Sequence, residues 1–401
     1  MVDVDRPEAE LRPVHRPWRV RMTSRDRHEE HRVATPIELL FDLCFVVAVA
    51  QAGLALHHAL AEGHLGDAIT SYFSVFFAIW WAWMNFSWFA SAYDTDDVLY
   101  RLAVFVQIVG ALIIAAGIPR AFDDADWKVV TVGYVIMRLA LVANWVRASR
   151  SDPASAATAR RMAIGVSVCQ VGWIGLLLFP RLLPWGFAVM VVCEVLVPVW
   201  AERAGGTAWH PHHIAERYGL FTIIVLGESI LAGAAAFQTA FEQRAANLEL
   251  YSSAFGGLVI VFALWWLYFA KPAGPILEAT EEGFVWGYGH YLVFASAAAL
   301  GAGLAVVIDV IDHTAHTSAT MAAAAVTVPA AIFLVTLWVL QIRPYPVKGA
   351  RAAPYLVGAV LVLTTTALGT GAVLGTGAVL VAVVAVCTAI SHGELEQDPE
   401  R

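Results

Sequence analysis

Long apolar runs separated by short polar joints occupy the chain from residue 37 almost to its C-terminus. Each run has about 17 to 25 residues, the length that a helix needs to cross the hydrocarbon core of a bilayer. We predict about twelve spans, at residues 37–60, 68–91, 98–118, 128–147, 161–180, 183–200, 214–237, 252–270, 286–311, 319–341, 354–371 and 373–390. Only the glycine-rich stretch Gly369–Gly377 separates the last two, which we expect to be short, tilted or re-entrant.

The fold class follows from the length of these runs. Strands of a membrane barrel have about ten residues of alternating polarity, whereas these runs are about twice as long and apolar all round. Composition agrees, with 59% hydrophobic residues, 14% charged residues and a mean hydropathy of +0.66. Soluble domains have roughly 45 to 50% apolar and 25% charged residues. The sequence therefore predicts an all-α, polytopic transmembrane helical bundle whose main partner is the lipid bilayer.

Two similar stretches predict an internal repeat. Glu38 opens the first span, and Ile79–Phe86 in the second is rich in Trp; Glu216 opens the seventh span, and the Trp-rich Leu264–Phe269 lies in the eighth. Because each half would hold six spans, the halves should be parallel repeats. We predict four regions: a mixed-charge cytoplasmic tail (1–35), a first six-helix half (36–205), a second six-helix half (206–391) and a short acidic cytoplasmic tail (392–401).

The distribution of positive charge predicts the orientation. With the N-terminus in the cytoplasm, 20 of the 25 Lys and Arg residues fall in cytoplasmic segments and about 4 in outer loops. This asymmetry follows the positive-inside rule, so both termini are predicted to be cytoplasmic. The net charge of −8, without a basic patch, gives no indication of a nucleic-acid partner. No nucleotide-binding or hydrolase motif is present, so we expect no cofactor and favour a protein that is not an enzyme.

The first predicted helix carries two carboxylates one turn apart. Thr35 suits the N-cap, Pro36 suits the first turn, and Glu38 is favoured there by the helix dipole. Asp42 lies deeper, about six residues in and among large apolar side chains. It requires either a neighbouring Arg or a proton or small cation as its partner.

Further ionisable residues fall inside the predicted spans. Arg217 and Glu228 are eleven residues apart in the seventh span and share a helical face, and Glu228 would lie near the middle of the membrane. A carboxylate at that depth should be protonated or paired. Arg138 and Glu194 lie at matching depths in the fourth and sixth spans, so a buried salt bridge between them is feasible and should mainly hold helices together.

Histidines gather at both predicted membrane faces, where they are either metal or proton sites or ordinary solvated side chains. One group is the stretch 209–216, WHPHHIAE, at the cytoplasmic start of the seventh span. The other would form at the outer face if the first and ninth spans are neighbours. It comprises His57, His58, His64, Asp309, Asp312, His313 and His316.

Four motifs carry a resemblance to a known family. They are ELLFDLCFVVAVAQ from Glu38, IWWAWMNF from Ile79, AGIPR at Ala116–Arg120 and ERYGLFTIIVLGESIL from Glu216. Together they resemble the bacterial low temperature requirement A family, over roughly residues 35–390. The resemblance implies a polytopic protein of the bacterial inner membrane.

Three functions remain open at this stage. The first is a secondary transporter or ion-conducting protein in which Asp42 and Glu228 bind a proton or small cation, with Arg217 as counter-charge and an unidentified small molecule as substrate. The second is a membrane-embedded enzyme for a lipophilic small molecule, with the same two carboxylates as acid and base and a pocket formed by the Trp-rich spans. The third is an accessory or sensory membrane protein whose Arg-rich tail meets anionic lipids.

Overall fold

The structure is a computed structural model that describes residues 17–26, 29, 32–242, 248–278, 280–344 and 353–395. These residues contain helices and no strands, which confirms the all-α prediction. The helices are α1 (Pro36–Ala61), α2 (Leu65–Ala92), α3 (Val98–Asp123), α4 (Lys128–Ser151), α5 (Ala156–Leu178), α6 (Leu183–Glu202), α7 (Pro211–Glu242), α8 (Leu248–Phe269), α9 (Gly274–Leu277), α10 (Thr280–Ile311), α11 (Ala319–Leu337), α12 (Ala353–Thr364) and α13 (Ala372–Leu395).

Every predicted span overlaps a helix, but the helices differ in their capacity to cross a membrane. Within the described residues, ten helical stretches are long and apolar enough to do so. The helix α2 is not among them, because its Trp, Tyr, Ser and Asn residues lower its mean hydropathy. The helices α12 and α13 count as one stretch, Ala353–Ser391. These two differences explain why ten stretches qualify although twelve spans were predicted.

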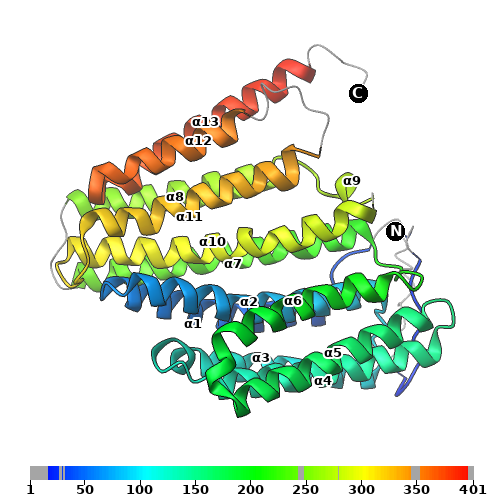
Figure 1. The fold of residues 1–401 in the computed structure, drawn as a ribbon. Helices are drawn as coiled ribbons and strands as arrows, with labels where there is room; N and C mark the ends of the chain where they lie inside the picture. Colours follow the sequence, from blue (N-terminus) through cyan, green and yellow to red (C-terminus); the bar gives the residue numbers. More distant parts are fainter. Residues whose placement is uncertain are drawn as a thin grey trace, which may run out of the picture.

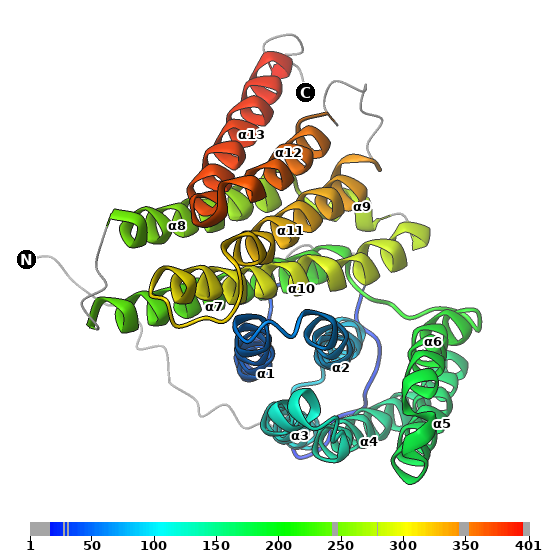
Figure 2. The ribbon, with the colours of Figure 1, turned by 60° about the vertical axis from the view of Figure 1, so that its left-hand side comes forward.

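The helices lie side by side in an extended bundle (Figure 1). Helices α1, α2, α7 and α10 occupy its middle, α3 to α6 lie on one side, and α8 and α11 to α13 lie on the other (Figure 2). In the first part of the chain, α1 packs on α3, α3 on α4, α4 on α5 and α5 on α6. In the second part, α7 packs on α10, α10 on α11, α11 on α12 and α12 on α13.

Glycines allow the closest of these helix contacts. A Cβ atom on Gly133 of α4 would lie 2.6 Å from the backbone oxygen of Gly110 on α3. A Cβ atom on Gly303 of α10 would collide with the backbone oxygen of Ala325 on α11. In a lipid environment helices associate largely through such close backbone packing. The two contacts therefore fix α3 against α4 and α10 against α11.

Of the last two helices, which were predicted to be short, tilted or re-entrant, only α12 is short, with 12 residues against 24 in α13. A 3-10 segment, Thr365–Gly371, joins α12 to α13, and Gly369 has φ of 57° in the left-handed region that favours glycine. The 12 residues of α12 extend only about 18 Å at 1.5 Å per residue, less than the ~30 Å hydrocarbon core. α12 is therefore short, and it turns back into α13 at this glycine.

Candidate functional site

The start of α1 places Glu38 inside the bundle. Its Oε2 atom accepts hydrogen bonds of 2.8 Å from both the amide and the hydroxyl of Thr35, the N-cap residue. Pro36 occupies the first turn, where its missing N–H costs nothing. This confirms the predicted helix start. The Glu38 side chain is nevertheless only 1% exposed, so it is not an ordinary capping residue at a solvated helix start.

One turn further along α1, Asp42 joins three helices. Its Oδ1 atom accepts a 2.6 Å hydrogen bond from Nη2 of Arg217 on α7 and a 2.7 Å bond from Nε1 of Trp83 on α2. The same Nη2 atom donates to Ser87 Oγ at 3.3 Å. Asp42 and Arg217 are fully buried. A hydrogen bond between two ionised groups is among the strongest in proteins, so this ion pair ties α1, α2 and α7 together.

A second acid–base contact lies beside the first. Glu38 Oε1 is 3.2 Å from Nε2 of His213, which precedes Arg217 by one turn of α7 and is fully buried. Two acids of α1 thus face two basic side chains of α7, and we call Glu38, Asp42, His213 and Arg217 the charged cluster. In the described protein, Asp42 Oδ2 and Arg217 Nη1 have no hydrogen-bond partner. The cluster therefore retains capacity for a further proton, cation or polar group.

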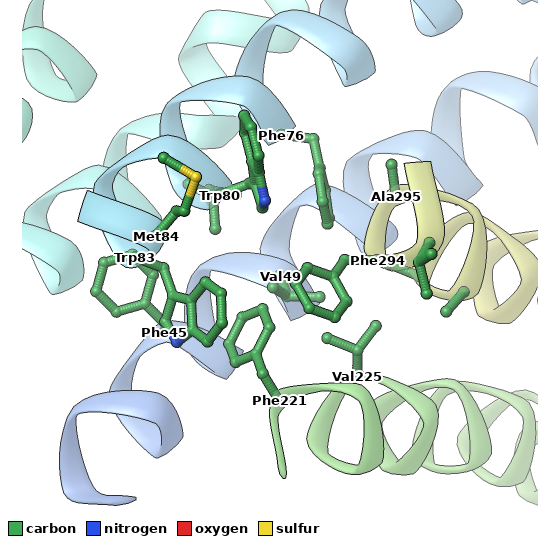
Figure 3. Packing of buried hydrophobic residues seen from close by; sticks show 14 of the residues in the cluster. Phe45, Val49, Phe76, Trp80, Trp83, Met84, Phe221, Val225, Phe294 and Ala295 are labelled. Carbon is green, nitrogen blue, oxygen red and sulfur yellow. The ribbon is translucent and has the colours of Figure 1, made fainter. Parts of the chain in front are cut away.

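An apolar layer follows Asp42 along α1 and Arg217 along α7; Figure 3 shows its side chains. Trp83 and Phe221 stack with ring centroids 4.4 Å apart and planes inclined at 21°, and Phe294 meets both rings edge-on. Phe45 and Val49 of α1 point into the same region (Figure 3). All five side chains are buried. The layer separates the cluster from the far half of α1 and α7.

The segment before α1 lies over the opposite end of the charged cluster. The amide of Ala34 donates to Glu216 at 3.2 Å. The guanidinium of Arg32 binds the backbone oxygens of Ala90 and Ser91, and Arg25 forms an ion pair with Asp94 at 3.1 Å. Arg25 and Arg32, which belong to the tail that was predicted to meet anionic lipids, therefore bind groups of the protein itself. Residues 1–16 of that tail lie outside the described part of the chain, as do residues 396–401 of the acidic tail.

Arg138 and Glu194 meet, as depth matching predicted. Arg138 Nη2 lies 2.8 Å from Glu194 Oε2, and both side chains are 1% exposed. Four more hydrogen bonds reach the carboxylate, from the side chains of Trp81, Tyr134, Gln170 and Trp173. Donors from α2, α4 and α5 thus converge on one residue of α6. This arrangement is typical of a structural centre that holds helices together.

Glu228 does not join the charged cluster. It lies on α7 beyond the apolar layer, is partly exposed, and makes no hydrogen bond or ion pair with the described protein. Its neighbour Gly227 is exposed, and no atom lies within 4 Å of the position that a Cβ would take there. The structure therefore separates Glu228 from Arg217, although both lie on one helix.

Residues of both predicted histidine groups make contacts in the structure. In the group predicted for the outer face, α1 and α10 are neighbours, which was the condition for this group to form, and His57 Nε2 lies 2.6 Å from Asp309 Oδ2. In the other group His213 belongs to the charged cluster, while His210 bonds the backbone oxygen of Glu29 at 2.7 Å. The described residues contain no group of three or more His, Cys, Asp or Glu side chains that could hold a metal ion.

Three buried polar partners were missed by the sequence analysis. Trp83 and Ser87 bind the charged cluster from α2, and His290 of α10 lies 3.0 Å from the hydroxyl of Tyr268. Nδ1 of His290 donates to the backbone oxygen of Trp286 at 2.7 Å, so Nε2 accepts from Tyr268. Trp83 and Ser87 are four residues apart and therefore lie on one face of α2. This spacing was the feature of the sequence that could have indicated a shared polar contact.

Comparison with known proteins identifies the family of the chain. The sequence pattern of the bacterial low temperature requirement A proteins matches residues 33–391. An uncharacterized protein of Rhizobium meliloti (strain 1021) is 28% identical over 275 residues, which cover 63% of this chain and 64% of that protein. The match thus spans slightly less than two thirds of the relative. No solved structure shows significant similarity.

Proposed function

The chain belongs to the bacterial low temperature requirement A family of multi-pass membrane proteins, and from this premise we propose that it is a secondary transporter or ion-conducting protein. One observation carries the proposal. Two acids and two basic groups meet in the interior at the contact between α1 and α7, and the hydrogen-bonding capacity of the Asp42–Arg217 pair is only partly used. Buried ionisable groups in membrane proteins commonly mark ion or proton pathways.

The comparison with the second buried pair supports this assignment. Glu194 accepts hydrogen bonds at both of its oxygens, as suits a structural carboxylate, although Nε and Nη1 of its partner Arg138 have no hydrogen-bond partner among the described residues. Asp42 instead accepts both of its hydrogen bonds at Oδ1. We assign Oδ2 as the atom that takes up the proton or small cation, and Arg217 as the counter-charge that is released when Asp42 is neutralised. A carboxylate whose charge is repeatedly neutralised and restored fits a role in ion or proton coupling better than a purely structural role.

The apolar layer gives the proposed pathway a closed state. In this proposal Glu228 provides a second carboxylate beyond the layer, and a proton or cation moves between Asp42 and Glu228 only when the layer opens. Hydrophobic constrictions of this kind block ions by excluding water. The segment before α1 covers the other end, so the structure corresponds to an occluded state in this scheme.

We further propose that two parallel six-helix halves, residues 36–205 and 206–391, provide the two moving parts. The series of contacts α1–α3–α4–α5–α6 in the first half has a counterpart in the second, α7–α10–α11–α12–α13, although α8 also packs on α13. A glycine contact joins the corresponding pairs α3–α4 and α10–α11. The charged cluster lies where α1 of one half meets α7 of the other. A relative movement of the halves would therefore act directly on the two acid–base contacts.

The test is proton and cation flux in liposomes containing the purified protein. We expect flux down an imposed gradient for the wild type and at least a tenfold loss for Asp42→Asn, because an amide cannot carry the charge that pairs with Arg217. Asp67→Asn, an exposed carboxylate in the first turn of α2, is the matched control and should behave as the wild type.

A second variant guards against misfolding. Asp42→Asn alone leaves Arg217 without its counter-charge, whereas Asp42→Asn with Arg217→Gln removes both charges together. The double variant should fold and lack flux. Wild-type flux in the folded double variant, or no flux in folded wild-type protein under any imposed proton or cation gradient, would overturn the proposal.

A further inference from the structure

A second site lies apart from the charged cluster, at the ends of several helices. A cavity of about 340 Å³ opens between the last turns of α2 and α6, the first turns of α10 and the loop that precedes α7. This volume falls within the range of small-molecule sites. Five aromatic side chains line it, namely Trp88, Trp145, Trp209, Phe284 and Tyr288.

The aromatic walls have fixed orientations. Trp88 and Phe284 are parallel within 3°, with ring centroids 6.4 Å apart, and Trp209 meets Trp88 edge-on at 4.8 Å. Trp88 donates from Nε1 to the hydroxyl of Tyr218, and Tyr288 donates to the backbone oxygen of Val195. These hydrogen bonds fix the indole N–H of Trp88 and the hydroxyl of Tyr288 against other parts of the protein. The cavity is therefore walled by rings that are held in place on different helices.

One carboxylate belongs to the same cavity. Glu202, the last residue of α6, accepts hydrogen bonds from the amide and the hydroxyl of Thr207, at 2.9 and 2.8 Å. The loop can turn back in this way because Gly205 and Gly206 have φ of 145° and 80°, which side chains rarely adopt. The loop thus holds the carboxylate in a defined orientation at the cavity.

In the part of the chain that the structure describes, the carboxylate of Glu202 has no counter-charge. Among the described residues no Lys, Arg or His side chain forms an ion pair with it. Thr207 supplies one hydrogen bond to each oxygen, so each oxygen can still accept from or face a positive group. A partly buried negative charge among aromatic faces favours a positive ligand over a neutral one.

We propose that this cavity binds an organic cation, a quaternary or protonated tertiary amine with apolar substituents. The aromatic faces attract such a cation through their quadrupoles, and aromatic cages are the common means of binding quaternary ammonium groups. Glu202 supplies the counter-charge, and the apolar substituents bury against Met84 and Met162, which also line the cavity. The inference does not depend on transport through the charged cluster.

The experiment is calorimetric titration of the full-length protein in lipid nanodiscs with benzyltrimethylammonium, compared with neopentylbenzene, its uncharged isostere. We expect the cation to bind at least tenfold more tightly than the isostere. Glu202→Gln should weaken cation binding at least tenfold and leave the isostere unchanged. Glu249→Gln, a carboxylate in the first turn of α8, is the control and should bind the cation as the wild type does.

A further variant tests the aromatic wall independently of the carboxylate. Phe284 is only partly buried, so Phe284→Leu should fold, and it should weaken cation binding severalfold. Three results would overturn the inference: no binding of the cation to folded wild-type protein, equal binding by wild type and both variants, or tighter binding of the neutral isostere. The last result would identify a site for neutral lipophilic molecules. Flux measurements are not involved, so failure here would leave the proposed function untouched.

Discussion

At the scale of single residues, the carboxylates of the two buried ion pairs differ in how completely they are satisfied, whereas Nε and Nη1 of both partner arginines have no hydrogen-bond partner among the described residues. Glu194 accepts five side-chain hydrogen bonds from four helical neighbours and its partner Arg138. Asp42 accepts two, both at the same oxygen. Desolvation of a charge costs several kcal/mol, and only full hydrogen bonding offsets that cost. The Glu194 carboxylate is therefore suited to a structural role, and the Asp42 carboxylate, whose Oδ2 atom has no hydrogen-bond partner among the described residues, to a change of charge.

Loss of one partner of the Arg138–Glu194 pair should destabilise the protein strongly. Arg138→Met leaves Glu194 as an uncompensated buried charge, so we expect a loss of about 3 to 5 kcal/mol in the free energy of unfolding. Arg138→Met with Glu194→Met removes both charges and should recover a large part of that loss. Denaturant unfolding of the single and double variants in mild detergent measures both values. Additive losses in the double variant would contradict a coupled pair.

A pH dependence is expected where the N-terminal segment meets the bundle. Burial raises the pKa of Asp97, but hydrogen bonds from Arg147 and from the amides of Val20 and Tyr100 outweigh burial and hold that pKa below its usual value. A lowered pKa means that Asp97 contributes stability above the pKa of the unfolded chain, about 3.9. This contribution is lost as the pH falls through the lower pKa of the folded protein.

Residues 17–26 should therefore detach in acid. We expect their backbone amides to exchange hydrogen faster below about pH 4, after correction for the intrinsic rate. Asp97→Asn should show the same faster exchange already at neutral pH, because an amide pairs weakly with Arg147. Asp67→Asn serves as the control. Unchanged protection in the Asp97→Asn variant would show that other contacts hold this segment.

At the scale of helices, the glycine contacts are the most sensitive positions. Gly133→Ala places a methyl group against the backbone of α3, and the two helices must separate. Such overpacking costs about 1 to 3 kcal/mol, more than the helix propensity that alanine gains. Gly175→Ala on α5 is the control, because no atom lies within 4 Å of its Cβ position. Thermal unfolding compares them, and equal midpoints would refute the close contact.

Much of the helix arrangement could be predicted from the sequence, and the reasons are physical. The length of each apolar run predicted a helix, because a helix that crosses a bilayer needs about 20 apolar residues. The matching depths of Arg138 and Glu194 in their spans predicted their contact. His213 was missed as a partner of Glu38 because pairing between α1 and α7 depends on helix packing, which periodicity does not encode. The same holds for the cavity at Glu202, whose aromatic walls come from segments far apart in the sequence.

At the scale of the whole molecule, the two proposed halves share one series of helix contacts but differ in detail. Trp80 and Trp81 of α2 are buried, whereas Trp265 and Trp266 of α8 are 45% and 52% exposed. The Trp-rich helices therefore do not supply matching walls of one pocket. A neutral lipophilic substrate between them, as the enzyme hypothesis requires, has no support from this arrangement.

The last prediction concerns the orientation of the whole molecule in the membrane. Arg147 and Arg150 lie near the end of α4, at the end of the bundle where Arg21 bonds Ser151, and 20 of the 25 Lys and Arg residues belong to that predicted cytoplasmic side. In a variant that lacks Cys44, Cys169, Cys193 and Cys387, an impermeant maleimide added to intact cells should label Asp124→Cys and spare Arg150→Cys.

Permeabilised cells supply the control for that experiment, since both exposed cysteines should then react. Asp124 lies between α3 and α4, at the opposite end of α4 from Arg150, so the two sites must lie on opposite faces if α4 crosses the membrane. Labelling of Arg150→Cys alone in intact cells would invert the orientation. The segment before α1 would then cover the charged cluster on the outer face, and Asp42 would be closed to the periplasm instead of the cytoplasm.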